Sequence, residues 1–460
     1  MTLPPGDDVL GVSGGHLTIE EVDTVELARE FGTPLYVVSE RQLRLNARAW
    51  RAAAARAWTH GETRVLPSLK ANTSPALRRV LTSEGLGCDV FGSGELEIAL
   101  RSGVPAETIS LNGATKSDAT LTRAIAANVR ITLDSHDELT RVRTIARARS
   151  LVARVRFRLR PWLPETTARS DFDADGGSAS AAIQRYRAGM PDEELEACLP
   201  EAIAAPEIEP LGLMAHATRQ TVELAFWHAY ARAVGDTAAA LAAANPPWRP
   251  RELDLGGGFA LPRDPTGRAF PHRLGAGLAP SPAEYARALG DGLEEGLRGG
   301  GLDPAGIALE VEPGRAIYGN AGIQLTRVLH VKRQTRPLAV SWIETDTSEA
   351  FLADTVFEAN SWTAVLASDP ARPPHPEAGL SGISCGFDLL VPAGQVPDAR
   401  PGELVAILDT GAYQDATASN FNAMPRPATV LVSGSRARLI KRRETLDDVV
   451  VRDLDEPGAP

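Results

Sequence analysis

Val65-Leu66-Pro67-Ser68-Leu69-Lys70-Ala71-Asn72 is the stretch from which the rest of the chain can be interpreted. A short apolar run ends at Lys70, and Asn72-Thr73-Ser74-Pro75 follows it, which is typical of a strand that turns into a helix. A lysine at the carboxyl end of a strand can lose solvent contact and serve as a Schiff-base amine. Taken alone, Lys70 fits a solvated surface charge equally well.

Strand-like and helix-like stretches alternate from residue 64 to residue 313, and Gly and Pro residues mark the joins. Helical patterns include Pro75–Ser83, Gly94–Arg101, Asp118–Ala127 and Asp137–Arg149. Eight such units predict an α/β domain of the (β/α)8 TIM-barrel type, although periodicity alone leaves a doubly wound open sheet as the alternative. The strand candidates are Arg64–Lys70, Gly87–Gly92, Ile109–Gly113, Val129–Asp134, Ala153–Arg160, Gly212–Ala217, Glu252–Gly258 and Ile307–Pro313.

A TIM barrel carries its functional groups at the carboxyl ends of its strands. In this sequence, Lys70 ends the first strand candidate and His216 lies at the end of the sixth. The glycines Gly256–Gly258 end the seventh, and Glu312 ends the eighth. The barrel interpretation therefore brings four motifs to one face of the domain.

The pattern changes from about Ile317, where strand-like stretches follow one another without regular helices between them. We predict an all-β second domain of sandwich or barrel-like type at 318–446, joined by residues 1–33, after a barrel at 34–317. The acidic end, 447–460, is predicted to be a flexible tail. The polar stretch 165–189 is predicted to be a mobile active-site loop, and 261–282 is a second long excursion.

Composition excludes several classes of partner. The chain has 460 residues, a net charge of −11 and 43% hydrophobic residues, which argues for a globular protein and against nucleic-acid or anionic-membrane partners. Its three widely spaced cysteines fit a reducing compartment. No signal peptide and no bilayer-length apolar run is found, so a cytoplasmic location is expected. No pattern predicts a metal site.

Two motifs suggest an anion site beside a carboxylate. Leu255-Gly256-Gly257-Gly258 can present backbone N–H groups to a phosphate, although a simple tight turn explains three glycines about as well. Glu312-Pro313-Gly314-Arg315 is more specific. Its carboxylate can accept a hydrogen bond from a pyridine N–H, and its guanidinium can bind phosphate oxygens. The alternative is an ordinary local ion pair.

Three further residues have both a structural and a chemical interpretation. His216 fits a core residue of an apolar strand, and its neutral ring could also stack on a flat cofactor. Cys385, in Ser384-Cys385-Gly386, could be a proton donor, although a buried cysteine is more often inert. Tyr413 offers a phenol in Gly411-Ala412-Tyr413, and could equally be a packing aromatic.

Together these motifs resemble the fold type III pyridoxal-phosphate decarboxylases, the group of diaminopimelate, ornithine and arginine decarboxylases. The resemblance extends from about Phe31 to Val432, and the end of the last motif is nearer the diaminopimelate branch. The matching motifs are Pro-Ser-Leu-Lys-Ala-Asn at 67–72, Cys-Asp-Val-Phe-Gly-Ser-Gly-Glu-Leu at 88–96, Leu-Asp-Leu-Gly-Gly-Gly-Phe at 253–259, Glu-Pro-Gly-Arg at 312–315, and Asp-Thr-Gly-Ala-Tyr at 409–413 with Ser-Asn-Phe-Asn at 419–422 and Arg-Pro at 426–427.

The resemblance implies pyridoxal 5'-phosphate as cofactor, decarboxylation of an amino acid as the reaction, and a homodimer with shared active sites. It implies that Lys70 carries the cofactor and that Cys385 of the other protomer protonates Cα. It implies that the remaining cofactor-binding residues are Asp89 near the site, His216 on the ring, Glu312 at the pyridinium, and Gly256, Gly257, Gly258, Arg315 and Tyr413 at the phosphate.

The sequence also departs from the family pattern. Arg219 stands where the family has a phosphate-binding serine, and Gly386 follows Cys385 where diaminopimelate decarboxylases have glutamate. The region 343–365, where they carry a substrate-binding arginine, contains none. Losing a group around which a site is built changes substrate preference strongly. We therefore expect another amino acid as substrate, larger, modified or carrier-linked, with Arg219, Glu349 and Asp388 as candidate specificity residues.

Two other functions compete with this prediction. An amino-acid racemase of the same fold is the nearest, but such racemases typically place an arginine at the ring nitrogen where this chain has Glu312. A non-catalytic decarboxylase-like binding protein is the other, and the retention of Lys70, Glu312, Arg315 and Cys385 argues against it.

Overall fold

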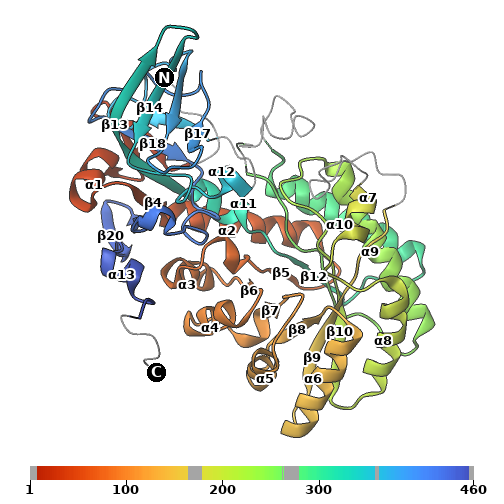
Figure 1. The fold of residues 1–460 in the computed structure, drawn as a ribbon. Coiled ribbons are helices and arrows are strands. Elements are labelled where there is room, and N and C mark those ends of the chain that lie inside the picture. Colours follow the sequence, from red (N-terminus) through yellow and green to blue (C-terminus); the bar gives the residue numbers. More distant parts are fainter. Residues whose placement is uncertain (1–7, 164–178, 262, 264–278, 358–361, 455–460) are drawn as a thin grey trace. The chain divides into compact units, whose positions relative to one another are not determined.

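The computed structural model describes residues 8–163, 179–261, 263, 279–357 and 362–454 (Figure 1). The chain divides into two compact units. A barrel unit comprises 44–260 and 279–317, and a β unit comprises 1–43, 261–278 and 318–460. No helix among the described residues has the length and hydropathy needed to cross a membrane.

Within the described residues, eight parallel strands of the barrel unit form one sheet in the order β5-β12-β11-β10-β9-β8-β7-β6. A parallel bridge between Ser68 and Asp89 links its two outer strands, β5 and β6. This confirms the predicted TIM barrel, and every strand candidate overlaps an observed strand. The strands are β5 (Thr63–Val65), β6 (Cys88–Val90), β7 (Ile109–Leu111), β8 (Arg130–Leu133), β9 (Ala153–Arg158), β10 (Ile208–Met214), β11 (Glu252–Asp254) and β12 (Ala308–Val311).

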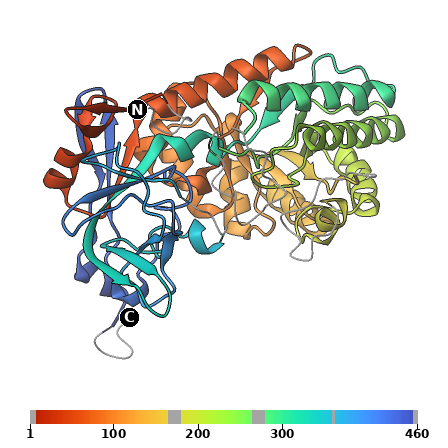
Figure 2. The same ribbon diagram turned by 90° about the horizontal axis from the view of Figure 1, so that it is seen from above.

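Helices surround these strands (Figure 1). The helix α3 begins at Pro75, where a proline costs no hydrogen bond. The long helices α9 and α10 lie side by side in both views (Figure 2). Gly292 allows this close contact, because a side chain there would collide with the carbonyl of His228. The helices are α2 (Glu40–Ala57), α3 (Pro75–Ser83), α4 (Ser93–Arg101), α5 (Asp118–Ala126), α6 (His136–Arg149), α7 (Ala179–Arg185), α8 (Asp192–Ala204), α9 (Leu224–Ala244), α10 (Pro282–Gly299) and α11 (Arg315–Tyr318).

Side chains inside the barrel are largely polar or charged. Along β12, Leu309 and Val311 alternate with Glu310 and Glu312, and both members of each pair are buried. The glutamates bond to residues of other barrel strands, so they face the interior and the aliphatic residues face the helices. Strand β9 repeats the pattern with Arg156 inside. The interior positions thus form a polar core enclosed by an apolar shell.

Three arginines and two glutamates form an ion cluster inside the barrel. Arg156 binds Glu310 at 2.6 Å, Arg64 binds it at 2.7 Å, and Arg130 contacts it as well. Glu252 lies 3.0 Å from Arg64 and 3.1 Å from Arg130. Burial opposes ionisation of Glu310, yet the arginines lower its pKa to about 2. Glu310 therefore stays ionised at neutral pH.

The β unit contains, among the described residues, a nine-stranded sheet and a separate three-stranded sheet, β1-β2-β3. The larger sheet runs β17-β16-β14-β13-β4-β19-β20, and β18 pairs with β13 and β15. The elements are β1 (Leu10–Ser13), β2 (His16–Ile19), β3 (Val22–Asp23), α1 (Thr24–Phe31), β4 (Leu35–Ser39), β13 (Gly322–Gln334), β14 (Val340–Thr345), α12 (Asp354–Phe357), β15 (Ala364–Leu366), β16 (Ala378–Ser381), β17 (Leu389–Val391), β18 (Leu404–Leu408), β19 (Ala428–Ser433), β20 (Arg436–Lys441) and α13 (Leu446–Val450).

Aliphatic side chains fill the β unit. One cluster contains Leu325, Leu408 and Val430, and all three are fully buried. A second cluster lies around Leu366, Leu380 and Ile407. This agrees with the predicted β-rich second domain.

The ends of the two units differ in detail from the expected ranges. Strand β4 pairs antiparallel with β13 and parallel with β19, so residues 35–39 belong to the β unit rather than to a barrel that starts at 34. In the expected tail, residues 446–450 form helix α13, which a capping box between Thr445 and Asp448 begins. Residues 455–460 lie outside the described residues.

Candidate active site

Lys70 lies just beyond β5 in a short 3-10 turn (Leu69–Ala71), rather than in the strand itself. Its Nζ donates to Asp89 Oδ2 at 2.9 Å and to Ser68 Oγ at 3.2 Å. Burial opposes ionisation of Asp89, but Lys70 and hydrogen bonds from Ser68 and Asn112 lower its pKa. The lysine side chain is 43% exposed while Asp89 is buried, so the amine is both held and accessible.

Asn112 joins this pair to Glu312. Its Nδ2 donates to Asp89 Oδ1 at 2.8 Å and also to Glu312 Oε1. Its Oδ1 accepts from Ser110 at 2.7 Å and from Thr132 at 2.5 Å. Because hydroxyl donors fix the oxygen, the amide nitrogen must face the two carboxyl groups.

Glu312 is buried at the end of β12. Burial, followed by the charges of Asp254 and Asp89, raises the pKa of Glu312 well above its usual range. Burial also raises the pKa of Asp254, and a hydrogen bond joins the two carboxyl groups. The site therefore holds a proton where the strand motif predicted a carboxylate, and a cationic N–H partner would favour the ionised form.

The three glycines after β11 form a closely packed turn. Gly256 and Gly258 have positive φ angles of 65° and 111°, which side chains rarely adopt. A Cβ at Gly256 would lie 2.6 Å from the carbonyl of Ala215, and one at Gly258 would collide with Thr218. A side chain at Gly257 would collide with the backbone of Glu312. The turn therefore requires glycine, and the backbone N–H groups of Gly256 and Gly257 donate to Asp254 Oδ1 and His216 Nδ1.

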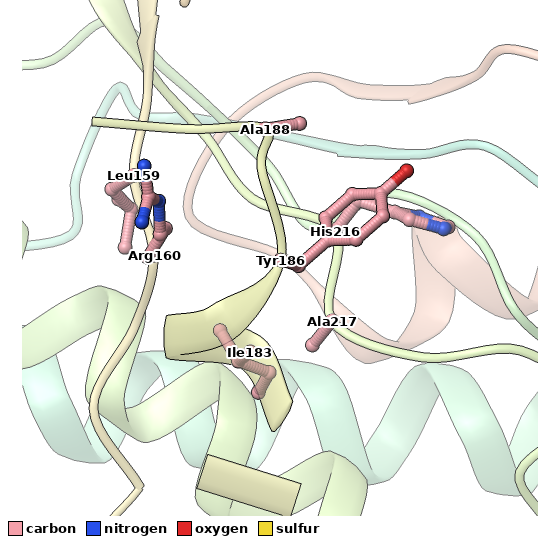
Figure 3. Close-up of a pocket in the computed structure, with 7 residues that line it drawn as sticks. All are labelled: Leu159, Arg160, Ile183, Tyr186, Ala188, His216 and Ala217. Atoms are coloured by element: carbon pink, nitrogen blue, oxygen red, sulfur yellow. The ribbon is translucent and has the colours of Figure 1, made fainter. Parts of the chain in front are cut away.

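His216 follows β10 beside this turn. Gly257 N–H donates to its Nδ1 at 3.2 Å, so the neutral ring carries its proton on Nε2. Burial, and then the charges of Arg158 and Lys70, lower the pKa of His216 to about 3. Tyr186, Ile183 and Ala217 line a pocket together with His216 (Figure 3). The imidazole is thus held uncharged at neutral pH.

Two arginines lie near these motifs. Arg315 begins α11 directly after the Glu312-Pro313-Gly314 turn and is buried. The Cα of Arg219 lies 3.3 Å from where a Cβ would stand on Gly258, so this arginine adjoins the glycine turn.

The β unit contains the other predicted residues. Cys385 is exposed, whereas Cys88 and Cys198 are buried. The carboxylate of Asp388 accepts backbone N–H groups from Glu349 and Ser384, each at 2.6 Å, and is buried. Asp388 therefore closes the loop that carries Cys385, which argues against direct contact with substrate.

Glu349 lies against the same loop. Its Oε2 accepts from the backbone of Asp388 at 3.0 Å, and a Cβ at Gly386 would collide with its Oε1. The carboxylate of Glu349 thus lies against Gly386, the residue that follows Cys385, and a side chain at position 386 would displace it.

Tyr413 lies in the turn after β18 and has a positive φ of 61°. The turn begins at Asp409, whose carboxylate binds Arg263 through two contacts of 2.7 and 2.6 Å. The phenol is half-buried. The predicted loop 165–189 is described only from 179, where α7 begins, and 164–178 lie outside the described residues.

The comparisons with known proteins agree with this geometry. Residues 40–319 match the family "Pyridoxal-dependent decarboxylase, pyridoxal binding domain". The chain belongs to the pyridoxal-dependent decarboxylase family. It is an amino-acid decarboxylase whose cofactor is pyridoxal 5'-phosphate. This confirms the predicted family, reaction and cofactor.

Similar proteins cover nearly the whole chain. A diaminopimelate decarboxylase of Actinosynnema pretiosum is 32% identical over 456 residues, 96% of this chain and 93% of that protein. One from Archaeoglobus fulgidus is 28% identical over 444 residues, 96% and 98% of the two chains. The crystal structure of diaminopimelate decarboxylase from M. jannaschii in co-complex with L-lysine has a TM-score of 0.85 at 26% identity, covering 98% of this chain and 99% of that one.

The residues of this decarboxylase fit the cofactor. Its aldehyde would need an accessible amine, as Lys70 offers. Its pyridine nitrogen would need a carboxyl group, as Glu312 offers with its raised pKa. Its phosphate would need a turn without side chains, which the three glycines form. These three features are independent of one another.

The motif analysis missed Ser68, Asn112, Asp254 and Arg158. Asn112 directly follows β7, Asp254 ends β11, and Arg158 is a buried residue at the end of β9. A polar residue at the carboxyl end of a barrel strand is a readable signal. Applied to every strand, it would have found three of the four.

Proposed function

We propose that this decarboxylase acts on an amino acid whose distal end differs from that of meso-diaminopimelate, with Lys70 as the residue that carries the cofactor. One observation carries the site proposal: the Lys70 amine, Asp89, Asn112 and Glu312 form a continuous hydrogen-bonded chain. This series of hydrogen bonds connects an amine to a carboxyl group that holds a proton.

The bound cofactor supplies an electron sink for the charge left at Cα when CO2 departs. Glu312 would hold the ring nitrogen of the cofactor, and a cationic N–H there would favour the ionised form of this carboxyl group. Asp89 and Asn112 keep that carboxyl group in place. The neutral His216 ring can stack on a flat group without adding a repulsive cation.

The anionic end of the cofactor is assigned to the glycine turn. The three glycines carry no side chain, so a phosphate can approach the backbone of the turn closely. Arg219 adjoins Gly258, and Arg315 is proposed as a further phosphate ligand because its motif matches the family pattern. Tyr413 is proposed as an additional phosphate ligand because its motif matches the family pattern.

Protonation of Cα is assigned to Cys385. All three cysteines are described, and this one alone is exposed. The family pattern implies that it comes from the second protomer of a homodimer, so we propose a dimer with shared active sites.

The proposed change of substrate rests on the distal-end residues. The stretch 343–365 contains no arginine, so it offers no guanidinium for a distal carboxylate. Glu349 instead brings a carboxylate beside Cys385. A carboxylate favours a cationic distal group and disfavours an anionic one.

The test is CO2 release by the cofactor-loaded protein across meso-, L- and D-diaminopimelate, L-lysine, L-ornithine and L-arginine. We expect higher kcat/KM with a compound that lacks a distal carboxylate, and no release by Lys70→Ala. Efficient turnover of meso-diaminopimelate in preference to the others would overturn the proposed substrate change. Racemisation without CO2 release would overturn the reaction.

A further inference from the structure

Asn422 contacts Cys385 through both ends of its side-chain amide. Its Oδ1 accepts the backbone N–H of Cys385 at 3.0 Å, and its Nδ2 donates to Cys385 Sγ at 3.3 Å. The two residues are 37 positions apart in the sequence. They come from the loop before β17 and the turn before β19.

The orientation of the amide follows from the chemistry of its neighbours. A backbone N–H can only donate, so the amide oxygen must face it. The NH2 group is then directed at the sulfur. A sulfur atom that accepts this hydrogen bond keeps its own S–H hydrogen pointing elsewhere.

The backbone at Asn422 is also suited to this role. Its φ is +55°, in the left-handed region that asparagine and aspartate tolerate better than other side chains. The neighbouring Asn420 donates to Glu444 at 2.6 Å and to the carbonyl of Met424 at 3.0 Å, and so fixes the turn from the other side.

We propose that Asn422 is a positioning residue for the proton donor of this decarboxylase: it aligns Cys385 and stabilises its sulfur as the proton leaves. The inference rests on the proposed role of Cys385. In that step the S–H bond breaks, a C–H bond forms at Cα, and the sulfur keeps the electron pair until solvent returns a proton. The Asn422 N–H strengthens its bond to sulfur as the negative charge develops.

The decisive variant is Asn422→Asp, which keeps the shape and the oxygen that accepts the Cys385 N–H. It loses the donor to sulfur and places a carboxylate there. We expect kcat to fall roughly tenfold or more while KM changes less than about twofold, because the donor acts in the proton transfer and not in substrate binding. Asn422→Ala is expected to lower kcat less, since it removes the donor without adding a charge.

A second readout does not depend on turnover. Iodoacetamide reacts with the thiolate form, and Cys385 is the exposed thiol. In the holoenzyme, Asn422→Asp is expected to slow alkylation of Cys385 roughly three- to tenfold across neutral pH. Asn420→Ala, which disturbs the same turn without touching the sulfur, is expected to leave that rate unchanged. Cys385→Ser identifies the labelled site.

Three results would overturn the inference. One is an Asn422→Asp enzyme with the wild-type alkylation rate and kcat. Another is an equal loss of alkylation rate in Asn420→Ala, which would indicate a general effect on the turn. The third is a further tenfold loss of kcat when Asn422→Asp is added to Cys385→Ser, because a residue that acts through the thiol has nothing left to position. If the wild type released no CO2 from any substrate, the alkylation rates would still test Asn422 while the proposed function failed.

Discussion

The two units of this decarboxylase bury opposite kinds of side chain. The barrel interior contains Arg64, Arg130 and Arg156 bound to Glu252 and Glu310. The β unit buries leucine, isoleucine and valine around its sheets. The charged interior and the candidate active site share the same strands. Glu310 lies two residues before Glu312, and Asp254 lies two residues before Gly256.

This difference indicates what each core contributes. Burying charges costs free energy, and the attraction between well-placed ion pairs offsets only part of that cost. A charged core is therefore weak evidence of stability. It does fix angles and distances, because each guanidinium must meet its carboxylates. An aliphatic core gains free energy from the area it removes from water, without such geometric demands. We infer that the barrel core orients the site and the β core contributes mainly stability.

The largest effect is expected from breaking the charged core. Arg156→Met should lower the free energy of unfolding by about 3–5 kcal/mol, because Glu310 and Asp254 lose a buried partner. Arg154→Met is the control on the same strand, since Arg154 is partly exposed and pairs with Glu209 at 3.5 Å. It should cost less than about 1 kcal/mol. Calorimetric unfolding compares the two, and equal losses would contradict the role of the interior position.

The matching change in the apolar core is Leu325→Ala. Leu325 is fully buried in the β unit, and truncation should cost about 2–5 kcal/mol through lost burial and a cavity. Cofactor absorbance and KM of the remaining folded enzyme should not change. A loss of cofactor binding at full folding would show that the β core also shapes the barrel site.

A third variant separates orientation from stability within the barrel. Asn112→Ala removes the donor shared by Asp89 and Glu312, and we expect kcat/KM to fall roughly tenfold to a hundredfold, as for other supporting partners of a reactive group. The unfolding midpoint should move far less than in Arg156→Met. Both are measured on one preparation, and a large fall in stability without a fall in kcat/KM would reverse the interpretation.

The smallest expected effect is the contribution of His216 to the pH dependence of the free energy of unfolding. Its pKa is about 3 when folded and near 6.5 when unfolded, so the unfolded chain binds the proton first. Stability from this residue is complete above pH 6.5 and is lost as pH falls towards 3. Between pH 7 and pH 5.5, His216→Phe should lose about 1 kcal/mol less than the wild type. Parallel denaturant titrations of the two proteins test this, and identical slopes of stability against pH would contradict a neutral His216 ring in the folded protein.

Much of the barrel could be predicted because local sequence patterns identify its strands. Alternation along Arg154-Val155-Arg156-Phe157-Arg158 and the Gly and Pro joins identify strands and turns. The partners of β4 could not be read in this way, because its pairing with β13 and β19 joins residues about 290 and 390 positions away. The same limit hid the contact of Asn422 with Cys385. Asn112 was missed although its place at a strand end was readable.

The aromatic residues behind the glycine turn give this protein an optical property. Phe259 follows Gly258, and the indole rings of Trp50 and Trp227 lie 4.5 and 4.7 Å from its ring. Both indoles are fully buried, so water does not quench their emission. A coenzyme that absorbs in the near ultraviolet and visible, bound beside that turn, would accept their excitation energy. Occupancy could therefore be followed by intrinsic fluorescence, without a label and without turnover.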